Sequence, residues 1–286
     1  MPFHSYPYLL KLFPIWVSAA MDVLSAFLFP PPPSTFVNVM TVVSTTALAM
    51  AGLSEINGKH LQYSKFWNAN GASKLSAEES KVSSKYGMLL AYTPAFLAGA
   101  ASFWLFPSGD ERVFLLKSAL TLHFFKRIFE VLFIHKYSSK MVLKTAIQIS
   151  LSYFMSTAIM IYTQHLSQGL PEPPIDLKNI GVGSFLIGII GNFYHHYLLS
   201  QTRKQGDTAY KIPKGGLFSF VVCPHYLFEI IGYFGFAFIS QELYPLCFSI
   251  GTAVYLAGRS YATRKWYISK FEAFPNNVKA LLPFVF

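Results

Sequence analysis

Charged residues are scarce in this chain, and their scarcity excludes most soluble folds. Of its 286 residues, 13% are charged, whereas a typical soluble domain has about 25%. Hydrophobic residues make up 53% of the sequence and aromatic residues 17%. A soluble protein of this composition would expose too much apolar surface to water. We therefore predict one all-α, polytopic membrane domain rather than two soluble ones.

Several other features are missing as well. Only two cysteines are present, Cys223 and Cys247, and both lie in apolar runs, so a disulfide framework is excluded and packed free thiols are expected. The sequence has no Asn-x-Ser/Thr site, no Walker A motif, no zinc-protease motif and no nucleophile elbow. The glycine-containing run 181–186 lacks a third glycine at the required position and follows no strand. A bound nucleotide would therefore lie in a helical cavity and not on a Rossmann sheet.

Lysine and arginine are distributed unevenly between successive apolar runs. Their counts are 1, 5, 1, 3, 1, 4, 0 and 4 along the chain, which is the positive-inside pattern of seven spans with an outer N-terminus and a cytosolic C-terminus. The formal net charge of +10 then reflects topology and attraction to anionic lipid. Nucleic acid is not an expected partner, because no soluble basic domain is present. We place the spans near 34–54, 87–107, 113–133, 145–164, 180–200, 217–239 and 243–262.

Residues 1–33 precede the predicted seven-span domain at 34–286. Their apolar run carries Lys11 and Asp22 and stops at four prolines. It lacks the charged start and the cleavage site of a signal peptide. We interpret it as an interfacial segment or an eighth, poor span, and Met21 is a plausible alternative start.

The third predicted span contains four ionisable residues, His123, Lys126, Arg127 and Glu130. Such residues are costly in lipid and should face a cavity or each other. Helical spacing places His123, Arg127 and Glu130 on one stripe and pairs Lys126 with Glu130. Two interpretations remain open, a structural ion network and a polar lining for an anionic or carbonyl ligand.

Further polar clusters follow in the C-terminal half. His195 and His196 are adjacent, but no carboxylate or cysteine at suitable spacing completes a metal site, so no metal is predicted. The basic loop 203–216 contains glycines and suits either a phosphate-rich ligand or an ordinary cytosolic loop. Next, Glu229 lies one helical turn from His225 inside an apolar run. Tyr226 beside them could donate a proton to a developing enolate.

The sequence resembles the steroid 5α-reductase family, which includes very-long-chain enoyl-CoA reductases and polyprenol reductases. The resemblance extends from Gly58 onward, is dense from Asn192 to Phe286, and gives a steroid-reductase-like part at about 140–286. Its most specific motifs are Arg203-Lys204…Tyr210-Lys211-Ile212-Pro213…Gly215-Gly216-Leu217-Phe218, Lys270-Phe271-Glu272…Pro275 and Ala280-Leu281-Leu282-Pro283-Phe284.

The resemblance implies a seven-span enzyme of the endoplasmic reticulum membrane that uses NADPH. Its reaction would reduce a carbon–carbon double bond conjugated to a carbonyl in an apolar steroid or acyl-lipid substrate. Carried over by position, the residues expected around the cofactor are Asn192, Arg203, Tyr210, Lys211, His225, Glu229, Arg259 and Tyr267.

The chain also departs from the steroid reductases at informative positions. Tyr92 and Phe124 stand where those enzymes have the glutamate and tyrosine that polarise the substrate carbonyl, while His225 replaces an asparagine and His196 an aspartate. Lys211 and Lys265 stand in place of arginines, which changes bidentate phosphate contacts. The expected catalytic residues are therefore Tyr226, Tyr92, His123, Lys126 and Arg127.

Three substrates follow from this mixture, which resembles a plant side-branch of the family. The C-terminal half favours a 3-oxo-Δ4 steroid as the first choice. The Lys126-Arg127 helix and the Cys223-Pro224-His225-Tyr226 segment resemble the enoyl-CoA branch and favour a trans-2-enoyl-CoA as the second. An allylic polyprenol is the weakest. A lipid transporter is the alternative from another class, although the sequence shows no inverted repeat.

Overall fold

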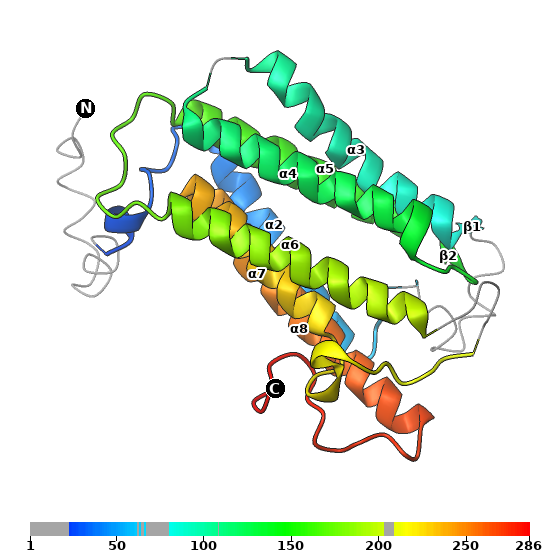
Figure 1. Ribbon diagram of the computed structural model, residues 1–286. Helices are drawn as coiled ribbons and strands as arrows, with labels where there is room; N and C mark the ends of the chain where they lie inside the picture. Colours follow the sequence, from blue (N-terminus) through cyan, green and yellow to red (C-terminus); the bar gives the residue numbers. More distant parts are fainter. Residues whose placement is uncertain (1–22, 62, 64–65, 67–79, 108, 203–208) are drawn as a thin grey trace.

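The computed structural model describes residues 1–286 apart from 1–22, 62, 64–65, 67–79, 108 and 203–208. The predicted interfacial segment therefore lies mostly outside the described residues, as do Arg203 and most of the first basic loop. Within the described part the chain is mostly helical (Figure 1). The helices are α2 Thr35–Ile56, α3 Ser84–Leu105, α4 Glu111–Phe129, α5 Leu143–Leu166, α6 Lys178–Gln201, α7 Pro224–Ser240 and α8 Leu243–Lys270.

Each of the seven predicted spans overlaps one of these helices. Three of them, α2, α3 and α5, are long and apolar enough to cross a membrane, so the helical expectation is confirmed while seven membrane crossings remain a prediction. Local signals explain several starts. Ser34 caps α2 after the prolines by accepting a hydrogen bond from the Val37 amide, and the Asp110 carboxylate accepts from the Val113 amide 2.9 Å away at the start of α4.

Two helices differ in extent from the predicted spans. The span predicted at 217–239 begins as a helix only at Pro224, because a 3₁₀ turn, η5 Gly216–Ser219, and an extended link precede it. Pro224 occupies the first turn of α7, where its missing N–H costs nothing. The last helix continues to Lys270, eight residues beyond the predicted end of its apolar run.

The helices form two layers that lean on each other (Figure 1). One layer holds α3, α4 and α5, and the other holds α6, α7, α8 and α2. A shared apolar core joins the layers, with Leu116 and Leu120 from α4 packed among Ile159, Phe185 and Phe236. At one end, strand β1 Lys81–Ser83 pairs antiparallel with β2 Lys140–Val142, which ties the start of α3 to the start of α5.

Glycines allow the backbones of α6 and α7 to touch. A Cβ atom on Gly188 would lie 2.4 Å from the amide nitrogen of Gly232 in the facing helix. No side chain fits at that distance, so the small residues permit a direct backbone contact, as is common between membrane helices. This contact fixes the spacing between the two helices that carry His196, His225 and Tyr226.

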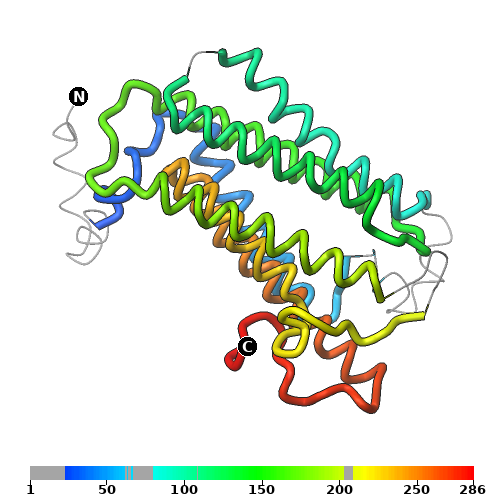
Figure 2. The backbone as a smooth tube through the Cα atoms, in the orientation of Figure 1, coloured from blue at the N-terminus to red at the C-terminus, as the bar shows by residue number. Residues whose placement is uncertain are grey.

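After α8 the chain turns back alongside the bundle (Figure 2). The amide of Val222 donates to the Lys279 carbonyl at 2.8 Å, and the Lys279 amide donates to the Phe220 carbonyl at 2.9 Å. The returning segment therefore holds the link between η5 and α7, which borders the cavity described next.

Candidate active site

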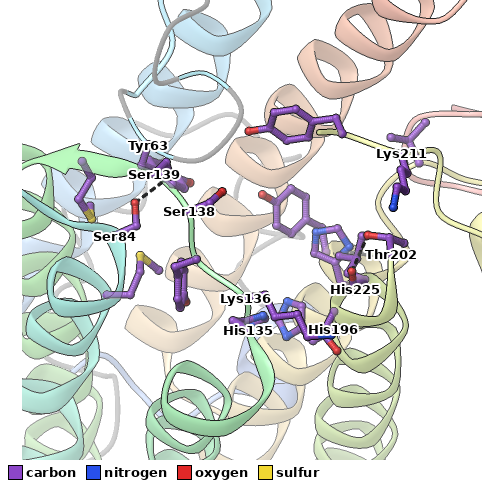
Figure 3. A pocket seen from close by; sticks show the side chains of 18 of the residues that line it. Tyr63, Ser84, His135, Lys136, Ser138, Ser139, His196, Thr202, Lys211 and His225 are labelled. Carbon is purple, nitrogen blue, oxygen red and sulfur yellow. Dashed lines mark hydrogen bonds between the residues drawn. The ribbon is translucent and has the colours of Figure 1, made fainter. Parts of the chain in front are cut away.

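A cavity of about 260 Å³ lies between the two layers, at the end of the bundle where β1 pairs with β2 (Figure 3). Its walls come from the start of α3, the loop after α4, the end of α6, the segment 210–211 and the start of α7. Six of the thirteen predicted site residues line it, namely Arg127, Tyr210, Lys211, His225, Tyr226 and Tyr267.

Glu130 organises one wall from behind. Its side chain has no exposed surface, and its two carboxylate oxygens accept from Lys126 at 2.8 Å and from Arg127 at 2.6 Å. The Nδ1 atom of His196, on α6, lies 3.0 Å from the same carboxylate. Buried charges are tolerated when they are paired in this way, so the third predicted span contains an ion network. Arg127 also lines the cavity, while its role toward a ligand stays a prediction.

The helical pattern changes at this carboxylate. The α4 helix passes into a π-helix, η4 Glu130–Ile134, whose last turn leads into the loop 135–139 on the cavity wall. Such π-helical turns are rare and are frequently found at functional sites. The His135 amide donates to the Glu130 carbonyl at 2.8 Å, so the widened turn links Glu130 to the first residue of the loop that lines the cavity.

Tyr92 does not line the cavity, unlike its proposed partner Tyr226. Its hydroxyl accepts a hydrogen bond from Arg127, and its ring lies in a buried cluster with Phe124 and Val131. Tyr92 thus holds Arg127 in place from the interior. Tyr226 is on the wall itself, with its ring centroid 4.3 Å from that of His225.

A second group of predicted residues lies deeper in the bundle. His123, Lys126, Asn192 and Glu229 surround a small cavity of about 10 Å³, which has room for about one water molecule. Lys126 donates to the Asn192 side-chain oxygen, and the Asn192 amide donates to the His225 carbonyl at 2.8 Å and to Glu229 at 3.5 Å. This network connects the ion pairs on α4 to the start of α7.

Arg259 lies apart from the cavity wall. Its guanidinium is 2.5 Å from Glu55 and is stacked between the rings of Tyr63 and Phe66, 4.4 Å and 4.3 Å from their centroids. Only 1% of its surface is exposed. Arg259 therefore reaches the cavity through Tyr63, which is a lining residue, whereas the sequence placed it directly on a phosphate.

Sequence reasoning missed the loop after α4, to which it assigned no site residue. His135, Lys136, Tyr137, Ser138 and Ser139 all line the cavity (Figure 3). Burial lowers the pKa of His135 well below its usual value and raises the pKa of Tyr137. Both rings are therefore neutral at physiological pH. The available signal was the unbroken polar run with two ring side chains directly after an apolar stretch.

The argument against a metal site overlooked a residue from another helix. Ligand atoms of Glu130, His135 and His196 all lie within 4.8 Å of one another. However, Lys126 and Arg127 already occupy the carboxylate oxygens of Glu130, so a metal ion would have to displace two cations. His195 faces elsewhere: its Nδ1 donates to the Gly191 carbonyl at 2.7 Å and its Nε2 accepts from the Leu217 amide at 3.1 Å.

Comparison with known proteins matches the part of the chain that builds most of this cavity. The family model described as 3-oxo-5-alpha-steroid 4-dehydrogenase matches residues 134–286, more than half of the sequence. This chain belongs to that steroid dehydrogenase family. The matched segment contains α5 to α8 and the missed loop 135–139, whereas Arg127 and Tyr63 contribute to the cavity from outside it.

Individual family members are named for two different reactions. The 3-oxo-5-alpha-steroid 4-dehydrogenase 1 of Macaca fascicularis is 40% identical over 107 residues, which are 37% of this chain and 41% of that protein. A very-long-chain enoyl-CoA reductase of Dictyostelium discoideum is 30% identical over 185 residues, 63% of this chain and 62% of that protein. A steroid 5-alpha-reductase of Gossypium hirsutum is 32% identical over 200 residues, 65% of this chain and 76% of that protein.

Proposed function

We propose that this protein reduces a carbon–carbon double bond conjugated to a carbonyl in a lipid substrate, with NADPH as the reductant. The observation that carries this proposal is the shared cavity of Tyr226 and Arg127, a phenol and a fixed cation on the walls of one space between helices. A developing enolate needs such groups, because preorganised donors stabilise negative charge as it forms.

The residues of the cavity fit a dinucleotide with several phosphates. Two lysines, Lys136 and Lys211, are on its walls in addition to Arg127, and Tyr210 and Tyr267 supply ring surfaces for flat groups. Tyr210 packs edge-on against Trp266 with 4.8 Å between ring centroids, and Tyr267 stacks on Phe274. We expect Lys211, Tyr210, Tyr267 and, from outside the described residues, Arg203 to hold the cofactor.

The protein's own groups would act on the substrate carbonyl. When bound, the reduced nicotinamide supplies a hydride to the β-carbon. Tyr226 donates a hydrogen bond to the carbonyl oxygen, and Arg127 adds positive charge from a position fixed by Glu130 and Tyr92. The α-carbon then takes a proton. Three imidazoles line the same cavity, with the ring centroid of His196 4.9 Å from that of His135 and 5.3 Å from that of His225.

A 3-oxo-Δ4 steroid remains the first choice of substrate, supported by the family model and by the cotton and macaque relatives. The second candidate is a trans-2-enoyl-CoA. It is favoured by Arg127 on the cavity wall and by the Dictyostelium relative. It is also favoured by Tyr92, which stands at the position of the steroid-polarising glutamate but bonds Arg127 in the interior and does not line the cavity. A polyprenol is weaker, because an allylic alcohol has no carbonyl until it is oxidised.

The proposed location is the endoplasmic reticulum membrane, with the chain crossing it several times and the C-terminus in the cytosol. The three long apolar helices support a membrane location. The lysines at 136, 140 and 211 occur at the cavity end of the bundle, which the positive-inside rule assigns to the cytosol. Membrane lipid is then a partner, and the cavity mouth faces the soluble cofactor pool.

The test is an NADPH-dependent reductase assay on microsomes that contain this chain. Progesterone and a long trans-2-enoyl-CoA are offered separately, and microsomes without the chain serve as the control. Reduction of progesterone alone supports the steroid branch, and reduction of the enoyl-CoA alone supports the elongation branch. Failure to reduce either compound, with the protein present and folded, would contradict the proposed function.

A further inference from the structure

The segment after α8 ends in a small closed loop that we call the C-terminal hook, residues 281–286. The amides of Leu281 and Leu282 both donate to the Phe286 carbonyl at 2.7 Å, and the Phe286 amide donates back to the Leu282 carbonyl at 3.1 Å. These bonds turn apolar side chains outward. Phe284 is 79% exposed and Val285 75% exposed.

The backbone of the hook is held in an unfavourable conformation. Phe284 has a φ of 66°, which is a left-handed value that a bulky side chain rarely adopts. Strained conformations of this kind persist where the surrounding structure imposes them, often at functional positions. In water, the backbone strain at Phe284 would not be offset by burial of its side chain. An apolar environment around the hook would supply the missing stabilisation.

The hook lies level with the end of an apolar run. The ring of Phe286 stacks on Tyr261 with 6.5 Å between centroids, and the ring of Phe284 is 5.6 Å from that of Phe220. Tyr261 is nine residues before the end of α8 at Lys270, a distance of about 14 Å along the helix. The hook therefore folds back to the level where the predicted span 243–262 ends, as Figure 2 shows for the chain path.

Basic residues follow this level along the chain. Between residues 264 and 286 the chain carries four basic side chains, Arg264, Lys265, Lys270 and Lys279, and a single acidic one, Glu272. Lys265 and Lys270 are exposed. An apolar tip with a basic flank matches the interface of a bilayer that contains acidic lipid, since the tip gains from the acyl boundary and the lysines from the headgroups.

We propose that the C-terminal hook inserts into the interfacial layer of one membrane leaflet, with Phe284 and Val285 among the acyl chains and the adjacent lysines at acidic headgroups. The Lys279 backbone pairs with Phe220 and Val222. Insertion would therefore brace the start of α7, which carries His225 and Tyr226, against the membrane. This placement is independent of any reaction in the cavity.

The test measures the surroundings of position 284 in the full chain in lipid nanodiscs. A trifluoromethyl-phenylalanine replaces Phe284, and ¹⁹F relaxation is recorded with dissolved oxygen, which concentrates in lipid, and with a water-soluble nickel chelate. The same label at Trp104, an 83% exposed residue of the apolar helix α3, gives the lipid reference. The label at exposed Asn277 gives the water reference.

We expect position 284 to behave like position 104, with a several-fold larger oxygen effect than nickel effect. Behaviour like position 277 would overturn the proposal, and so would shielding from both reagents, which would indicate a second copy of the chain on the hook. A label at Val285 repeats the measurement if the first labelled protein does not fold. The double substitution Lys265→Gln and Lys270→Gln should reduce the extra insertion seen when phosphatidylserine is added to phosphatidylcholine, and an unchanged lipid response would contradict the role of these lysines.

Discussion

Glu130 is a single carboxylate that holds three cationic or ring side chains in register. Lys126, Arg127 and His196 all contact it, although its side chain has no contact with solvent. Removing such a group leaves unpaired positive charge inside the bundle, which costs far more than the loss of a surface pair.

We expect Glu130→Gln to lower the free energy of unfolding by about 3–5 kcal/mol, because Lys126 and Arg127 lose the charge that compensates them. Denaturant or thermal unfolding in detergent measures the change. The matched control is Glu111→Gln, which removes a surface pair with Lys178 at 2.5 Å, in which the Glu111 side chain is 69% exposed. That change should lower the free energy of unfolding by at most about 1 kcal/mol. Equal losses of stability in the two variants would show that the buried ion network stabilises the fold no more than a surface pair does.

Tyr226 should act on the reaction and not on the fold. Its ring packs beside His225, and the residue lines the cavity. We expect Tyr226→Phe to retain the folded structure and to lower kcat by about 10²- to 10³-fold, the usual effect of removing one donor to an oxyanion. Tyr162→Phe on the exposed face of α5 is the control, and wild-type activity of Tyr226→Phe would remove this tyrosine from the mechanism.

At the scale of helices, the close packing of α6 against α7 requires glycine at the contact between them. Gly188→Ala would place a methyl group 2.4 Å from a backbone atom of α7, and neither backbone can yield without separating the helices. We expect a loss of about 1–3 kcal/mol in unfolding free energy, as in overpacked cores. Gly183→Ala on the same helix meets nothing within 4 Å and should leave stability unchanged or raise it by up to about 1 kcal/mol. Thermal unfolding of the two variants decides the point.

The helices were predictable from the sequence, whereas their partners were not. Apolar runs of suitable length locate the helices α2 to α8, because a chain in apolar surroundings must satisfy its backbone hydrogen bonds internally, as a helix does. The start of α7 was misplaced, since the link before it follows from pairing with Lys279, far away in sequence. The contact of Glu130 with His196 likewise joins residues 66 apart. Periodicity within one helix carries no information on such contacts. For this reason the sequence located the helices of Arg259 and Tyr92 correctly but placed both side chains in the site, whereas neither lines the cavity.

At the scale of the whole molecule, Glu242 should make stability depend on pH. This residue lies between α7 and α8 with no exposed surface, and burial raises its pKa to about 7 against the opposing effects of Ser167 and Arg112. The folded protein thus keeps a proton that the unfolded chain releases near pH 4.5. Since the folded state binds more protons, stability falls as pH rises from about 4.5 to about 7 and then levels off.

Thermal unfolding in detergent at about pH 5 and about pH 8 measures this slope. The substitution Glu242→Gln should flatten it and raise the unfolding temperature at the higher pH, because an amide has no charge to desolvate. Glu272→Gln, at an exposed site, is the control and should retain the slope. A slope that persists in Glu242→Gln would assign the pH dependence to other groups.

The glycine contact between α6 and α7 has a mechanical consequence. Because their backbones touch, α6 and α7 are expected to move together as one rigid unit. Helix α4 packs less closely against this pair than α6 and α7 pack against each other. Any motion that widens the cavity must therefore occur between the α3–α4–α5 layer and the α6–α7 pair. A bulky apolar molecule would enter sideways between these two layers. The contact of Glu130 with His196 and the hydrogen bond from Lys126 to Asn192, which cross from one layer to the other, would have to open for its entry.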